Sequence, residues 1–201
     1  MKEYRIVRLN ARPNWAAVEK APVEEYPWGG DYRPEAFAQL AYEEGRGFHV
    51  RMTCREDAPR AVYTQPDDPV CQDSCLEFFA DFAPDSGKGY LNMEANANGT
   101  LLLGLGTQRH DRKPVRGMDC PLPQLNAWRE GAFWGWQAFV PLSMLQAIYG
   151  VSDFAPGTVL RGNFYKCGDK TAQPHYGVWS PVQAPQPDYH RPECFGRLLM
   201  E

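Results

Sequence analysis

The chain has no long apolar run. No segment approaches the roughly 18 consecutive apolar residues that a membrane-spanning helix requires. The N-terminal sequence MKEYRIVRLNARPNW lacks the apolar core of a secretory signal peptide, and the chain shows no internal repeat or low-complexity tract. We therefore expect a soluble cytoplasmic protein that is not bound to a membrane.

Positive charge is also scarce. The formal net charge is −4, and the longest basic cluster, from Arg109 to Arg116, is interrupted by Asp111 and Pro114. A surface that binds nucleic acid needs an uninterrupted basic patch. We do not expect a nucleic acid partner.

Cysteine is present, but not in a metal-binding pattern. The pair Cys71 and Cys75 has no second pair at zinc-finger spacing, and the four histidines are scattered. Without an export signal, six cysteines are expected to remain free thiols. The sequence therefore identifies no metal ligands.

Glycine, proline and aromatic residues are abundant and predict the fold class. The 201 residues include 18 glycines and 18 prolines without a period, and 13% of residues are aromatic. This composition favours many short strands joined by turns. We predict one all-β domain over residues 1–201, an antiparallel two-sheet β-sandwich of jelly-roll type with one short helix.

Nine segments show strand patterns: Arg5–Leu9, Phe37–Tyr42, Phe48–Cys54, Ser74–Phe82, Gly89–Ala97, Thr100–Gly104, Trp134–Val140, Val159–Lys166 and Arg197 to the end. The single helix is predicted at Pro141–Tyr149, with Gly150 as its C-terminal cap. Four intervening segments are rich in proline, glycine and polar residues, and we expect them to be long loops: Arg12–Arg33, Arg55–Pro69, His110–Glu130 and Lys170–Glu193.

Two successive strands, joined by the loop Ala83–Gly89, are expected to form a hairpin with two different faces. One face is apolar and is predicted to lie in the core; it consists of Leu76, Phe78, Phe82, Leu91 and Met93. On the other face, Glu77 is predicted to lie opposite Glu94 or Asn96, beside the rings of Phe79 and Tyr90. Carboxylates and amides next to aromatic rings suit a sugar, so this face is a candidate binding surface.

Several short motifs occur in a characteristic order along the chain. They are Asp73-Ser74 followed by Glu77-Phe78-Phe79, Gly89-Tyr90 leading into Asn92, Glu94, Asn96 and Gly99, Pro141 to Leu145, Arg161 to Tyr165, and Trp179-Ser180-Pro181 with His190-Arg191-Pro192 and Phe195-Gly196. In this order they resemble the carbohydrate-binding modules of family 9, which are β-sandwiches found attached to xylanases and in stand-alone bacterial proteins, and whose members are often secreted. The resemblance covers most of the chain from about Phe37.

The resemblance implies a non-catalytic site in which two tryptophans clamp a terminal sugar. Trp179 matches one of these tryptophans, Glu77 a carboxylate that binds hydroxyls, and Asn163 lies in a strand that supplies an amide. The polar row of Asn92, Glu94 and Asn96 completes the predicted ligand-binding set. The expected partner is a mono- or oligosaccharide from xylan- or cellulose-related polysaccharide breakdown.

The second tryptophan is missing from its position before Asp73, where this chain has Val70 and Cys71. One wall of the clamp is therefore absent or is supplied from a loop by Trp28, Tyr63 or Trp134. Related modules also hold structural calcium through loop oxygens, and the acidic loops available for it here contain Asp67, Asp68 and Asp85.

Each site residue has a structural alternative. Trp179 is equally well explained as a core ring, Glu77 as a carboxyl that fixes a loop, and the polar row as an ordinary solvated sheet face. Two other functions also remain open. One is a glycoside-active enzyme with Glu77 and Glu94 as acid and nucleophile, and the other is an interaction domain that has lost its sugar.

Overall fold

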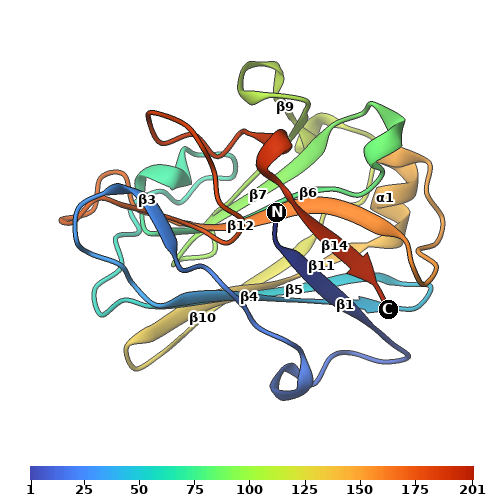
Figure 1. Cartoon of the computed structure of the whole chain (residues 1–201), viewed down its shortest axis with the longest axis horizontal. Coiled ribbons are helices and arrows are strands. Elements are labelled where there is room, and N and C mark those ends of the chain that lie inside the picture. Colours follow the sequence, from blue (N-terminus) through green and yellow to red (C-terminus); the bar gives the residue numbers. More distant parts are fainter.

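The protein is described by a computed structural model that covers all residues 1–201. Two layers of strands pack face to face (Figure 1). The first sheet has the order β14-β12-β6-β7-β8-β9; in addition, β13 pairs with β12, and β3 pairs with β13. Its strands are β14 (Gly196–Met200), β12 (Val159–Cys167), β6 (Cys75–Asp81), β7 (Tyr90–Asn96), β8 (Leu101–Gly106), β9 (Lys113–Pro114), β13 (His175–Val178) and β3 (Glu25–Gly29).

The second sheet has the order β10-β11-β5-β4, with the short strand β2 beside β4. Its strands are β10 (Gln124–Glu130), β11 (Phe133–Pro141), β5 (Gly47–Arg55), β4 (Ala36–Glu43) and β2 (Ala21–Pro22). Neighbouring strands within this order are antiparallel. The nine strand segments identified in the sequence are all present, with ends that differ by one or two residues.

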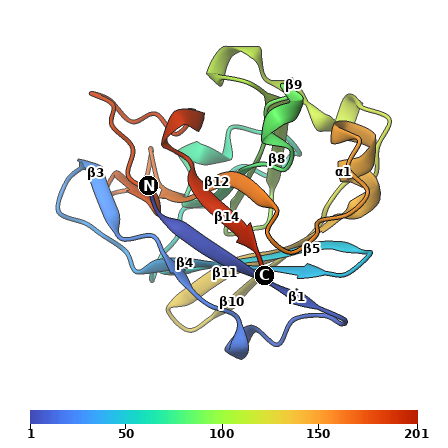
Figure 2. The ribbon, with the colours of Figure 1, turned by 45° about the vertical axis from the view of Figure 1, so that its right-hand side comes forward.

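Strand β1 (Glu3–Leu9) joins the two sheets, as Figure 2 shows. Its first half, Glu3–Ile6, pairs with β14, and its second half, Val7–Leu9, pairs with β4. Both pairings are parallel, so the structure is a curled mixed sheet rather than a purely antiparallel sandwich. Sequence alternation predicts the strand but contains no information about the direction of its partners.

Three strands of more than two residues lie in segments that the sequence predicts as loops. They are β3, β10 and β13. Strand β3 contains Pro27 and pairs only with β13, and β10 pairs only with β11. Edge strands tolerate proline and weak alternation because one side of the backbone needs no partner, so their sequence signal is weaker than that of a central strand.

The main core lies between the two sheets. It contains all five residues predicted for the inner face of the β6–β7 hairpin, each at most 2% exposed: Leu76, Phe78, Phe82, Leu91 and Met93. Trp136 of β11 crosses the interface, and its indole N–H donates to the Leu76 carbonyl at 3.1 Å. Burial of each large apolar side chain contributes roughly 1.5–3 kcal/mol, so this layer supplies much of the stability.

Helix α1 (Leu142–Tyr149) follows β11 directly, as the sequence predicts. Pro141 is its N-cap, and Gly150 ends the helix in the left-handed conformation with φ 79°. Leu145 and Ile148 point into the core. At eight residues α1 is short, and the structure contains no helix with the length and apolarity needed to cross a membrane.

The second face of the hairpin is covered. Segment 182–195 and the turn at Val70–Gln72 lie over it, and Phe79, Tyr90, Tyr165, Tyr189 and Phe195 form a second, smaller core there. The surface predicted as an open binding face is therefore an interior layer, because alternation along two strands does not report on a distant loop that packs onto them.

Candidate functional site

Glu77 lies directly opposite Glu94 in the β6–β7 hairpin, one of the two registers predicted from the sequence. Both side chains are nearly inaccessible, at 2% and 5% exposure. Burial raises the pKa of Glu94 to about 7; the hydrogen bond from Asn92 lowers the pKa, but by less than burial raises it. Burial and the charge of Glu94 also raise the pKa of Glu77 well above its ordinary value. Both effects favour the protonated form of Glu77 over its carboxylate.

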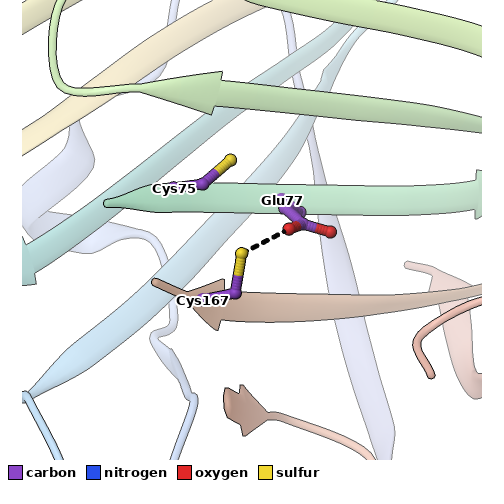
Figure 3. Close-up of side chains that lie close together, drawn as sticks. All are labelled: Cys75, Glu77 and Cys167. Carbon is purple, nitrogen blue, oxygen red and sulfur yellow. Dashed lines mark hydrogen bonds between the residues drawn. The ribbon is translucent and has the colours of Figure 1, made fainter. Parts of the chain in front are cut away.

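Two thiols surround the Glu77 carboxyl (Figure 3). Cys75 and Cys167 face each other across β6 and β12, and the Cys167 thiol donates to Glu77 Oε1 at 2.9 Å. All six cysteines of the chain are free thiols. Burial raises the pKa of the Cys75 thiol to about 12 and also raises the pKa of the Cys167 thiol well above its ordinary value, so both carry their protons.

The donor atoms of Cys75, Glu77 and Cys167 all lie within 4.8 Å of one another. Thiolates and a carboxylate are ligand types that zinc accepts, but a structural zinc site almost always has four ligands, and this cluster offers three. Calcium prefers six to eight oxygens, and two of the candidate carboxylates in the acidic loops are already engaged within the protein. Asp67 accepts from the Leu103 N–H and pairs with Arg116. Asp68 accepts from the N–H groups of the residues at positions 64 and 65.

A cavity of about 170 Å³ opens beside Glu77. Residues from six separate segments line it: Cys71, Arg109, Cys167, Asp169, Tyr176, Pro187, Tyr189 and His190, with Glu77 at the buried end. Ligand sites for drug-sized molecules are typically 300–1,000 Å³. The volume therefore has room for one small polar ring, and not for a longer chain.

The two tyrosines that line the cavity differ in how much of the ring is already covered by other protein groups. Tyr189 stacks on Tyr165 with ring centroids 4.1 Å apart, and its hydroxyl donates to the Lys166 carbonyl at 3.2 Å. Tyr176 of β13 is only partly buried. Its ring is the aromatic surface in the cavity most available to a ligand.

Charged groups at the rim are held by their neighbours. Arg109 forms two hydrogen bonds to Asp188 Oδ1, at 2.9 and 3.1 Å. His190 bonds the Tyr90 hydroxyl through Nδ1 at 2.9 Å. Burial and two nearby arginines, Arg112 and Arg109, lower the pKa of His190 to about 3, so its ring is neutral. The rim thus presents a positioned arginine and a neutral imidazole.

Of the six predicted site residues, Glu77 lines this cavity. Glu94 and Asn92 lie behind it on β7, where the Asn92 amide donates to Glu94 Oε1 at 2.8 Å. Arg112 closes this layer with a hydrogen bond to Asn92 Oδ1 and packs its guanidinium 4.2 Å from the centre of the Tyr90 ring. Glu94 and Asn92 do not line the cavity, so their contact with a sugar stays a prediction.

Trp179 lies on the opposite side of the first sheet. Its ring is 3% exposed, belongs to the main core, and packs edge-on against Phe164 and Tyr4. It also packs closely against Gly196, where an added Cβ would be 2.4 Å from a ring atom. This placement favours a core role for Trp179, and its role in sugar binding stays a prediction.

Asn163 and Asn96 satisfy backbone groups in the interior. The Asn163 amide donates to the Ser180 carbonyl at 2.9 Å, and its oxygen accepts from the Ser180 N–H at 2.8 Å. Asn96 donates to the Tyr63 carbonyl and to Asp73, each at 2.9 Å. Both amides hold loops in place, so a direct contact of either with a sugar remains a prediction.

None of the three aromatics proposed as a replacement wall lines the cavity, although Trp28 packs against the lining Tyr189 with ring centroids 6.1 Å apart. Trp28 donates its indole N–H to the Ala184 carbonyl at 2.8 Å, and Trp134 is fully buried in the core. The Tyr63 hydroxyl is bonded to Gln72 at 2.6 Å. Cys71, which stands near the position of the missing tryptophan, does line the cavity.

Four lining residues carry no sequence signal of their own: Arg109, Asp169, Tyr176 and Tyr189. Tyr176 and Tyr189 come from a segment predicted as a loop, and Arg109 and Asp169 lie between the predicted segments. Only the spacing of Tyr176 relative to the Trp-Ser motif at Trp179 could have indicated it.

Comparisons with known proteins agree with this architecture. The family model described as "Carbohydrate-binding family 9" matches residues 9–200. A search of curated proteins finds no match.

Among solved structures, a candidate carbohydrate-binding protein from Bacteroides uniformis ATCC 8492 has a TM-score of 0.82 and 27% identity, over 100% of this chain and 99% of that one. A family 9 carbohydrate-binding module from Caldicellulosiruptor kristjanssonii in complex with glucose has a TM-score of 0.70 and 13% identity, over 100% of this chain and 96% of that one. The same module in complex with cellotriose has a TM-score of 0.70 and 12% identity, over 100% and 94%. On the family match over nearly its whole length, the chain belongs to carbohydrate-binding family 9.

Proposed function

We propose that this protein is a non-catalytic sugar-binding module that holds one sugar unit in the cavity beside Glu77. The observation that carries the proposal is the position of the Glu77 carboxyl, buried at the closed end of a cavity of about 170 Å³ whose rim carries Arg109 and Tyr176. A sugar ring combines an apolar C–H face with a rim of hydroxyls. Tyr176 suits the face, and the polar groups suit the hydroxyls.

The raised pKa of Glu77 fits this role. A protonated carboxyl has one O–H donor and retains acceptor capacity, and a sugar hydroxyl needs both. Burial and Glu94 raise the pKa of Glu77, which favours the form that offers both kinds of hydrogen bond. The partly buried ring of Tyr176 then supplies a surface in place of the missing tryptophan wall.

The sugar class follows from the relatives. The Caldicellulosiruptor kristjanssonii module binds glucose and cellotriose, so we propose a glucose-type terminal unit of a mono- or oligosaccharide. The cavity holds one ring, so further units of an oligosaccharide would extend into solvent.

The enzyme alternative is less well supported. Retaining glycosidases place two carboxyl groups about 5–5.5 Å apart around the scissile bond. Glu94 does not line the cavity here, because it lies behind Glu77 and is hydrogen-bonded to Asn92. A substrate in this cavity would therefore meet only one carboxyl of the proposed pair.

The proposal is tested by calorimetric titration of the full chain with glucose, xylose and cellotriose. Tyr176→Ala removes the aromatic surface and should weaken binding about tenfold, from a stacking contribution of roughly 1–1.5 kcal/mol. Glu77→Ala should weaken it by a similar factor, from the loss of hydrogen bonds worth roughly 0.5–1.5 kcal/mol each. Glu193→Gln, an exposed carboxyl outside the cavity, is the control and should bind as the native chain does.

Two results would contradict the proposal. One is unchanged affinity in both cavity variants at native melting temperature, which would place the sugar elsewhere. The other is release of the aglycone from aryl glycosides by the native chain and not by Glu77→Ala, which would make the protein an enzyme.

A further inference from the structure

A second cavity, of about 330 Å³, lies on the outer face of the second sheet. Its walls come from the loop after β1, from the turn between β4 and β5, and from β10 and β11. The outer face of the second sheet is separated from the Glu77 cavity by the main core. The volume falls within the range of ligand sites.

A buried carboxylate organises one side of this cavity. Glu43 is 4% exposed; its Oε1 accepts from Arg46 at 3.0 Å, and its Oε2 bonds His49 Nε2 at 2.7 Å. The hydrogen bond from His49 is the main cause that lowers the pKa of Glu43, so the carboxyl is ionised. The Glu43 carboxylate therefore holds the Arg46 guanidinium and the His49 imidazole in position at the cavity wall.

Aromatic rings stand beside these groups. Phe139 of β11 lies 4.8 Å from the His49 ring and 5.8 Å from the Arg46 guanidinium. Trp15 lies on the opposite loop, which is anchored to β4 because the buried Gln39 amide donates to the Trp15 carbonyl at 2.7 Å. Trp15 is therefore fixed over the sheet while its ring stays partly exposed.

Three exposed amides line the floor. Gln137 of β11 lies directly opposite Asn126 of β10, and Gln124 lies opposite Phe139. None of these side chains has a hydrogen-bond partner in the protein. A primary amide offers both donors and an acceptor, which is what sugar hydroxyls require.

The charge of the cavity is positive although the chain as a whole carries −4. Arg12 and Arg46 face one carboxylate, Glu43. Arg12 is exposed and forms no ion pair within the protein. A free guanidinium matches a carboxylate in a bidentate geometry.

We propose that this outer cavity is a second carbohydrate site, which takes an acidic sugar unit of the uronic acid class. The sugar ring lies against Trp15 and Phe139, its hydroxyls bond the three amides, and its carboxylate pairs with Arg12. This site is independent of the Glu77 cavity and of the proposed function.

The test is calorimetric titration of the full chain with a trigalacturonate and, separately, with its methyl ester, which keeps the rings and removes the charge. The acid is expected to bind at least tenfold more tightly than the ester, and increased salt should reduce the difference. Arg12→Ala should remove the preference for the acid. Trp15→Ala should weaken the binding of both the acid and the ester.

Two control variants separate the sites. Arg55→Ala removes an exposed arginine at the far end of β5 and should change nothing. Glu77→Ala should leave trigalacturonate binding intact even if it abolishes glucose binding. Equal affinity for acid and ester, no binding of either, or loss of acid binding in Glu77→Ala would each overturn the proposal. Unchanged melting temperatures of Arg12→Ala and Trp15→Ala confirm that a loss of affinity is local.

Discussion

Replacement of Glu94 by glutamine should stabilise the protein above pH 7 and leave it nearly unchanged below pH 4.5. Glu94 is buried opposite Glu77, and the pKa of its carboxyl rises from 4.5 to about 7 on folding. The folded state therefore binds more protons than the unfolded chain between these two pH values. Under linkage, stability must fall as pH rises through this window and then stay level above it.

The size of the effect follows from the pKa. Each pKa unit corresponds to about 1.4 kcal/mol, so ionised Glu94 lowers the free energy of unfolding by about 3 kcal/mol at pH 8. Glutamine keeps the acceptor that Asn92 uses at 2.8 Å and removes the charge. Glu94→Gln should recover most of that free energy at pH 8 and little of it at pH 4.

Urea unfolding of the native chain and the variant at pH 4, 5, 6, 7 and 8 measures the difference directly. Glu130→Gln, an exposed carboxyl on β10, is the matched control and should show no pH-dependent gain. The reasoning is refuted if Glu94→Gln is destabilising at pH 8, or if its effect is the same at every pH.

Three further predictions concern the framework. Trp179→Ala should lower the free energy of unfolding by roughly 3–5 kcal/mol, because the ring is buried in the core. The folded fraction should bind sugar normally in calorimetry. Loss of sugar binding at native stability would instead show that Trp179 contacts the sugar. Gly162→Ala should lower the free energy of unfolding by roughly 1–3 kcal/mol, because the new Cβ would lie 2.7 Å from the Phe79 carbonyl oxygen; an unchanged urea midpoint would contradict this. Cys75 and Cys167 should react with a disulfide reagent far more slowly in the native protein than in urea, since both thiols are buried and protonated; six equally fast thiols in the native protein would contradict their placement.

The fold could be predicted to a large extent from local patterns. Period-two alternation identified β6 and β7 and their apolar inner face, and it limited the partner of Glu77 to Glu94 or Asn96, of which the structure shows Glu94. It could not show that segment 182–195 covers the other face, because that contact joins residues about 100 positions apart, such as Tyr90 and His190. For the same reason, alternation could not predict the parallel pairing of β1 with β14 and β4.

Of the residues that line the candidate site, only the central one, Glu77, could be predicted from the sequence as a site residue. Glu77 was identified by its motif, and it lines the cavity. Arg109 and Tyr176 come from segments whose positions depend on the packing of distant loops, so no local spacing specifies them. Asn163 and Asn96 illustrate the opposite difficulty, because a buried amide that satisfies backbone groups has the same sequence appearance as one that binds a hydroxyl.

The most direct test of the central claim is a crystal structure of the full chain soaked with glucose. The account predicts one glucose in the Glu77 cavity, with a hydroxyl within hydrogen-bond distance of the Glu77 carboxyl and the ring against Tyr176. Glucose bound at Trp179, or bound only in the cavity beside Trp15 and Phe139, would contradict it.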